Sequence, residues 1–108
     1  MIINGIEYRN MPLDFNAVCK LEDMGVDITS VDEKAMTTAR AYAALCMRKP
    51  LHVAGEEIEK HVMNGGNLNV IFEAFASEVE KSGFFQALQK QAVEDEPAEA
   101  ENSKIEKA

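Results

Sequence analysis

The sequence predicts a small α+β domain that is mainly helical, in which an N-terminal β-hairpin is followed by four or five short helices. Two patterns lead to this prediction: an Asn-Gly dipeptide between short apolar segments, and amphipathic periodicity over most of the remaining chain. An acidic segment with few large apolar residues marks the C-terminal end of the predicted domain. Of the 108 residues, we expect 1–92 to form one domain and 93–108 to be a disordered acidic tail.

The hairpin is predicted from its turn. A two-residue Asn-Gly loop suits a type I′ turn, which needs a positive φ angle at both central residues. The second strand alternates, so Ile6 and Tyr8 are expected to face the domain, and Glu7 and Arg9 the solvent. A two-stranded hairpin is marginally stable alone, so we expect it to dock on the helices or to gain strands from a second copy of the chain.

Start and stop signals predict the first two helices. Asp14 is a suitable N-cap for a helix over about residues 15–24. Ser30 begins a capping-box motif, which predicts a second helix over about residues 31–47 that Pro50 would end. The second helix is rich in small residues that let other helices approach closely, namely Ala39, Ala41, Ala43 and Ala44.

The second half of the chain predicts a short helix, a longer amphipathic helix and a last helical segment. The short helix covers about residues 56–64 and ends at Gly65-Gly66. Asn67 then caps the clearest helix of the chain, and Ser82 is a candidate cap for the last segment. The apolar residues of the longer helix recur every three or four positions and are Leu68, Ile71, Phe72, Phe75, Ala76 and Val79.

Charge and composition exclude several classes of function. The net charge is −8, and half of it belongs to the tail, which has six acidic residues and two lysines. Nucleic-acid backbones and anionic membranes repel such a chain, so we expect it to bind neither. No apolar run approaches the length of about 20 residues that a membrane span needs. No signal peptide is recognised, so we expect the protein in the cytoplasm.

No spacing of residues indicates a catalytic or metal site, so we expect no enzyme activity and no cofactor. Cys19 and Cys46 are expected to be buried thiols, with a disulfide or a reactive thiol as the alternative. His61 follows Glu57 by four residues, so the two side chains share one helix face. This spacing favours a solvated surface pair over a metal site, which would need three or four ligands. His52, in a predicted loop, is expected to have a structural or neutral role.

Two features indicate binding of a partner. One is the acidic tail, which either solubilises the protein or tethers a basic partner. The other is a group of phenylalanines near the end of the domain. Phe84 and Phe85 are adjacent, so on one helix their side chains point about 100° apart, and either both are packed or at least one is exposed for a partner. The candidate partner-binding residues are Phe75, Phe84 and Phe85.

Several segments together resemble one protein family. They are the Asn-Gly hairpin, the motif Lys20-Leu21-Glu22-x-Met24-Gly25, the alanine-rich helix with Tyr42-Ala43-Ala44-Leu45, the acidic helix that begins with Gly55-Glu56-Glu57, and the helix end Ser82-Gly83-Phe84-Phe85 before a polar tail. Over about residues 1–90 this arrangement resembles the tail assembly chaperones of long-tailed phages and prophages of Gram-positive bacteria.

The resemblance implies a non-enzymatic function in virion assembly. Such chaperones coat the long, helical, aggregation-prone tape measure protein before the tail tube polymerises around it. They are often made in two forms, of which the longer arises by a programmed ribosomal frameshift, so the acidic tail would mark where the two products diverge. The implied partners are the tape measure protein, a longer form of this chain, the tail tube protein and further copies of the chain in a homo-oligomer.

The residues leave a second function open, that of a small oligomeric regulator or adaptor of a prophage or bacterium, such as an antitoxin. In that case the alanine-rich helix would be a dimer face, and no client would be needed. In the chaperone hypothesis, a hydrophobic groove would hold an amphipathic client helix. Co-expression with the long helical protein encoded downstream distinguishes the two hypotheses.

Overall fold

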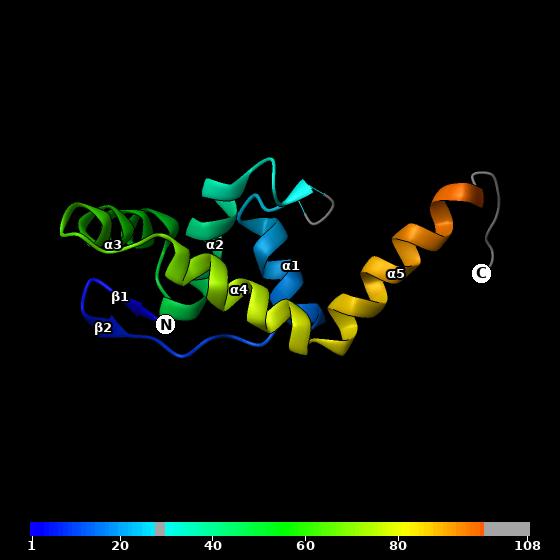
Figure 1. Cartoon of the computed structure of the whole chain (residues 1–108), viewed down its shortest axis with the longest axis horizontal. Helices are drawn as coiled ribbons and strands as arrows, with labels where there is room; N and C mark the ends of the chain where they lie inside the picture. Colours follow the sequence, from blue (N-terminus) through cyan, green and yellow to red (C-terminus); the bar gives the residue numbers. More distant parts are fainter. Residues whose placement is uncertain (28–29, 99–108) are drawn as a thin grey trace.

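The computed structural model describes residues 1–27 and 30–98 and shows a short hairpin followed by helices (Figure 1). The elements are β1 (Ile2–Ile3), β2 (Ile6–Glu7), α1 (Phe15–Asp23), α2 (Ala35–Met47), α3 (Leu51–Met63), α4 (Asn69–Lys81) and α5 (Gly83–Ala98). The hairpin and the first four helices form one body, and α5 begins at its edge and extends away from it. The predicted architecture, a hairpin followed by short helices, is therefore confirmed.

The hairpin turn has the predicted geometry, and the orientation predicted for its second strand is confirmed at Glu7, Tyr8 and Arg9 but wrong at Ile6. The φ angle is 53° at Asn4 and 84° at Gly5, as a type I′ turn requires. Ile3 and Ile6 are paired across the strands, yet Ile3 is fully buried whereas 53% of Ile6 is exposed. Tyr8 is partly buried, as expected. β1 is the strand that contacts α3, so it supplies the core residue and β2 is the outer strand.

Hydrogen bonds to α3 hold the hairpin turn against the body. The Asn4 backbone N–H donates to His61 Nδ1 at 2.8 Å, and the Asn4 side-chain amide donates to Glu57 Oε1 at 3.1 Å. The other ring nitrogen, His61 Nε2, lies 3.1 Å from the Asn67 carbonyl oxygen. Because Nδ1 accepts, Nε2 is the nitrogen that donates in the neutral ring. The Glu57–His61 pair therefore docks the hairpin, which supplies the support that an isolated hairpin lacks.

The predicted Asp14 cap is confirmed, whereas the N-cap position of α4 is Leu68, which forms no side-chain cap hydrogen bond. Asp14 Oδ1 accepts a hydrogen bond of 2.8 Å from the Ala17 N–H in the first turn of α1. At the start of α4, Asn67 Oδ1 accepts a hydrogen bond of 2.8 Å from the N–H of Asn69, the first residue of the helix. Each of these two hydrogen bonds satisfies a backbone donor that has no partner within its own helix.

The predicted start of the second helix is wrong. The capping box expected at Ser30 does not form, because the Glu33 N–H donates to the Ser30 backbone carbonyl at 3.1 Å within a turn. The backbone at Lys34 is also non-helical, with φ −122° and ψ 51°. α2 therefore begins at Ala35, and the residues before it turn the chain between α1 and α2.

The third helix is longer than predicted. α3 begins at Leu51, directly after Pro50, and not at residue 56. His52 therefore lies in the first turn of a helix and not in a loop, and its side chain is exposed. Gly55 lies inside the helix, where a Cβ atom would come within 3.4 Å of the Arg40 side chain on α2. Gly55 therefore lies where α3 meets α2 and does not break the helix.

α2 forms the centre of the core. Every residue of Ala41–Met47 is buried, and the helix contacts α1, α3 and α4. The alanines are thus covered within one chain, so α2 does not provide the dimer face expected for a regulator. The Tyr42 hydroxyl donates to the Met11 carbonyl oxygen at 3.0 Å, and burial raises the pKa of this phenol. Cys46 is buried and Cys19 is partly buried, and both are free thiols.

Ser82 joins α4 to α5 and caps α5 as predicted. Its hydroxyl oxygen accepts a hydrogen bond of 2.9 Å from the Phe85 N–H. The same hydroxyl donates to the carbonyl oxygen of Leu13, in the segment before α1. Ser82 therefore links the start of α5 to the segment before α1.

The disorder predicted for the acidic tail is not confirmed. α5 continues to Ala98, past the predicted domain boundary at residue 92. The rest of the predicted tail, residues 99–108, lies outside the described residues. Among the helices of the described chain, none combines the length and the apolar character that crossing a membrane requires.

Candidate binding groove

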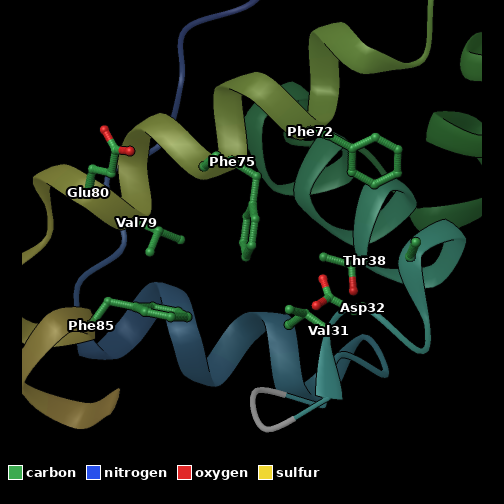
Figure 2. Close-up of a pocket in the computed structure, with 10 residues that line it drawn as sticks. Val31, Asp32, Thr38, Phe72, Phe75, Val79, Glu80 and Phe85 are labelled. Carbon is green, nitrogen blue, oxygen red and sulfur yellow. The ribbon is translucent and has the colours of Figure 1, made fainter. Parts of the chain in front are cut away.

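An open, mainly apolar groove lies between α4, the start of α5 and the N-terminal part of α2 (Figure 2). Its volume of about 560 Å³ falls in the range of roughly 300–1,000 Å³ that is typical of ligand sites. The groove brings together segments that are far apart in the sequence. Its lining residues are Val31, Asp32, Ala35 and Thr38 from α2 and the turn before it, Phe72, Phe75, Ala76, Val79 and Glu80 from α4, and Phe85 from α5.

The amphipathic pattern of α4 explains why the groove exists. Ile71 and Ala74 are buried against the body. Phe72, Phe75 and Val79 pack on the edge of the core, are only partly buried and line the groove. The apolar stripe of α4 is therefore wider than the surface that its neighbours cover. Apolar positions that stay partly uncovered in this way are typical of binding surfaces.

Aromatic contacts fix one wall of the groove. The Phe75 ring meets the Tyr42 ring edge to face, with 5.4 Å between ring centroids. On its other side it meets the Phe85 ring at 6.3 Å and an interplanar angle of 89°. Edge-to-face pairs at such distances are favourable. Because Tyr42 and Phe85 are both buried, they hold Phe75 in a defined orientation at the groove.

Three polar side chains accompany the apolar lining. Thr38 is 3% exposed, and its hydroxyl is a buried polar group without a hydrogen-bond partner in the described part of the chain. Asp32 and Glu80 are exposed carboxylates, and no basic residue lies among the described lining residues. The groove therefore combines an apolar floor with negative charge and one unpaired hydroxyl.

The structure brings two of the three predicted partner-binding residues together at this groove. Phe75 and Phe85 both line it, although Phe85 is 2% exposed and acts mainly as a core residue. Phe84 does not line the groove. Its ring is 37% exposed and packs edge to face on Phe15 at 5.5 Å. The adjacent pair thus diverges as helical geometry requires, with one residue buried and one exposed.

Residues before and within α2 that line the groove were missed by sequence reasoning. Val31 and Asp32 were assigned to a helix, whereas they lie in the turn before it. Thr38 occupies a position on the apolar face of α2, between Ala35 and Tyr42 at helical spacing. A polar residue on an otherwise apolar face was a signal for this site, and it was overlooked.

A second hollow has the opposite charge. It lies at the C-terminal ends of α1 and α2, has a volume of about 730 Å³ and includes Lys20, Arg48 and Lys49 beside Asp23. Cations are favourable at helix C-termini, which explains why these three basic residues gather there.

In the described chain, no group of three or more His, Cys, Asp or Glu side chains is arranged to hold a metal ion.

Comparisons with known proteins give no identification. No protein-family model matches the chain, and no curated protein or solved structure matches it.

Proposed function

We propose that this protein is a tail assembly chaperone of a long-tailed phage or prophage of Gram-positive bacteria. It would bind the tape measure protein and keep it soluble in the host cytoplasm, without acting as an enzyme. The resemblance of residues 1–90 to that family motivates the proposal. The single structural observation that supports it best is the apolar groove between α2, α4 and α5.

The groove suits the client that the proposal names. A tape measure protein is a long helical chain, and an amphipathic helix presents apolar side chains at positions i, i+3, i+4 and i+7. In helix-in-groove recognition, this stripe lies in an apolar groove of the partner. Phe72, Phe75 and Val79 are three and four residues apart, so they form a ridge against which a client helix would pack. Covering the stripe would keep client molecules from associating through it.

The charge of the chain supports the same function. A net charge of −8 would keep a coated complex soluble. We propose that several copies of the chain bind along one client, as a homo-oligomer and together with any longer, frameshifted form. The tail tube protein would displace them as the tube polymerises.

Co-expression with the long helical protein encoded downstream tests the proposal, followed by affinity capture and size-exclusion chromatography. We expect the client in the soluble fraction, in a complex with several copies of this chain. Val79→Glu places a charge in the groove and should lower the captured client at least about tenfold. Val62→Glu is the matched control, because Val62 is 46% exposed on α3 and lies outside the groove.

Two outcomes would count against the proposal. One is a client whose solubility does not change when this chain is present. The other is equal loss of client with Val79→Glu and Val62→Glu, which would place binding away from the groove. A stable homo-oligomer that captures no client would favour the regulator or adaptor instead.

A further inference from the structure

We propose that the groove recognises an amphipathic helix of defined chemistry, in which lysine or arginine flanks the apolar stripe and one small polar side chain interrupts it. This inference deepens the proposed function and rests on it only for the identity of the protein that carries the helix. Three features of the groove lead to it: the apolar ridge on α4, the unpaired hydroxyl of Thr38 and the carboxylates of Asp32 and Glu80.

The ridge determines the apolar part of the ligand. Phe75 is held between Tyr42 and Phe85 by edge-to-face contacts, so the wall of the groove is already formed without a partner. Phe72 and Val79 lie on either side of Phe75 along the same helix and are partly exposed. A preformed apolar groove needs little reordering when it binds. Leucine or methionine side chains at helical spacing would fill it.

Thr38 determines the polar part. A buried hydroxyl without a partner lowers stability, and a ligand group that bonds to it recovers that loss. Figure 2 shows the Thr38 hydroxyl on the groove side, toward Val31 and Asp32. The backbone groups of a bound helix are already paired within that helix. The group that reaches Thr38 must therefore be a side chain, such as serine, threonine, asparagine or glutamine.

The carboxylates determine the charge of the ligand. Asp32 and Glu80 lie toward opposite ends of the groove (Figure 2). Lys81, which follows Glu80 in the sequence, is 3.6 Å from the Glu78 carboxylate on the same helix. No basic residue among the described lining residues offsets Asp32 and Glu80. Lysine or arginine on both flanks of the apolar stripe would complement this pattern.

The same charges argue against α5 of a second copy as the occupant. The sequence of α5 includes the acidic run Glu94-Asp95-Glu96, which the two carboxylates at the groove would repel. Beyond it the tail adds further acidic residues. A basic-flanked helix from a different protein therefore fits the groove better than this chain's own C-terminal segment.

Synthetic helical peptides of about 18 residues test the inference, with binding to the full chain measured by fluorescence anisotropy. The peptides share one leucine–alanine stripe and differ in their flanks, lysine or glutamate, and in one central stripe residue, serine or alanine. We expect the lysine-flanked peptide with serine to bind tightest. Glutamate flanks should weaken binding at least about tenfold at low salt, and alanine for serine about three- to tenfold.

Variants of the chain separate the two contributions. Asp32→Asn with Glu80→Gln should reduce the preference for lysine flanks to about twofold or less and leave the preference for serine unchanged. Thr38→Val should remove the preference for serine and leave the preference for lysine flanks unchanged. Glu7→Gln with Glu59→Gln is the matched control, because both are exposed acids outside the groove. A variant whose groove is merely distorted would bind all the peptides more weakly by the same factor.

Equal binding of lysine- and glutamate-flanked peptides would overturn the inference, as would a serine preference that survives Thr38→Val. Self-association that Val79→Glu abolishes, without peptide binding, would identify a second copy as the occupant and also overturn it. If the variants leave capture of the tape measure protein intact, the chaperone function stands and the inference fails. If the peptides behave as expected but the client is not solubilised, the proposed function fails alone.

Discussion

At the scale of single residues, Thr38 and Asn4 carry polar groups with opposite effects on stability. The Thr38 hydroxyl is buried in the wall of the groove without a partner in the described chain. Asn4 donates from its backbone and its side chain to α3 and so attaches the hairpin. Removing the Thr38 hydroxyl should therefore stabilise the protein, whereas removing the Asn4 side-chain amide should destabilise it.

Thr38→Val removes the hydroxyl and keeps a branched side chain. We expect the free energy of unfolding to rise by about 1 kcal/mol, because a buried polar group without a partner is lost. Urea unfolding followed by circular dichroism measures this change. Thr37→Val is the control, since Thr37 is partly exposed, and should change stability by no more than about 0.5 kcal/mol. A loss of stability in Thr38→Val would show that the hydroxyl is bonded in solution.

Asn4→Gly keeps a residue that tolerates a positive φ angle and removes the side-chain amide. The hydrogen bond from Asn4 is the main cause that lowers the pKa of Glu57 below its ordinary value of 4.5, with a smaller effect of Lys60. We therefore expect this pKa to rise in the variant. An NMR titration of the side-chain carboxyl carbons measures it.

The sign of the pH effect follows from the lowered pKa of Glu57 in the folded state. The stabilisation is complete above pH 4.5 and is lost as the pH falls through the folded pKa. Acidification should thus weaken the unmodified protein more than Asn4→Gly. An unchanged Glu57 titration would refute the contact.

At the scale of elements, local interactions were predictable and packing effects were not. The Asn-Gly turn and the Asp14 cap involve only residues close in sequence, and both are confirmed. The Ser30 motif was misleading because the chain must turn between α1 and α2 before a helix can start. The third helix was predicted to begin at about residue 56, but it begins at Leu51, and Gly55 lies inside it beside the Arg40 side chain. Tertiary contacts thus overrode local preference.

The attachment of α5 gives a prediction at this scale. Phe85→Ala should destabilise the protein by roughly 3–5 kcal/mol, because it removes a buried ring between α4 and α5. Phe84→Ala should cost about 1 kcal/mol, because that ring is 37% exposed and packs on Phe15. Thermal unfolding compares the two variants. Equal losses would mean that the two rings are not divided between core and surface in this way.

At the scale of the whole molecule, the described chain is a compact body with one helix extending from it, and two of its hollows have opposite charge. Periodicity and adjacency in the sequence led to the prediction of Phe75, Phe84 and Phe85 as partner-binding residues, but they could not identify the groove that Phe75 and Phe85 line. The groove depends on how α2, α4 and α5 pack together, and this packing also brings Thr38 into the same lining as Phe75 and Phe85. Such a site follows from tertiary structure and from no single motif.

Truncation after residue 92 tests the domain boundary. The buried apolar residues of the described chain run from Ile3 to Phe85, so the shortened protein should keep its core. We expect its unfolding temperature to change by no more than about 3 °C. Removing the tail also removes half of the net charge, so solubility near neutral pH should fall. A much lower unfolding temperature would show that the end of α5 contributes to the fold.

The His61 imidazole that docks the hairpin also governs which residues the chain can accept in the loop before α4. Gly65 has a φ angle of 93° and open space around its Cβ position, so asparagine is a tolerable replacement there. At Gly66 a Cβ atom would overlap the His61 ring, and both nitrogens of that ring are already engaged, by Asn4 and Asn67. A methyl group at position 66 would thus displace the His61 ring and weaken its hydrogen bond to Asn4. The two neighbouring glycines therefore matter for different reasons, Gly65 for its dihedral angle and Gly66 for the attachment of a distant segment.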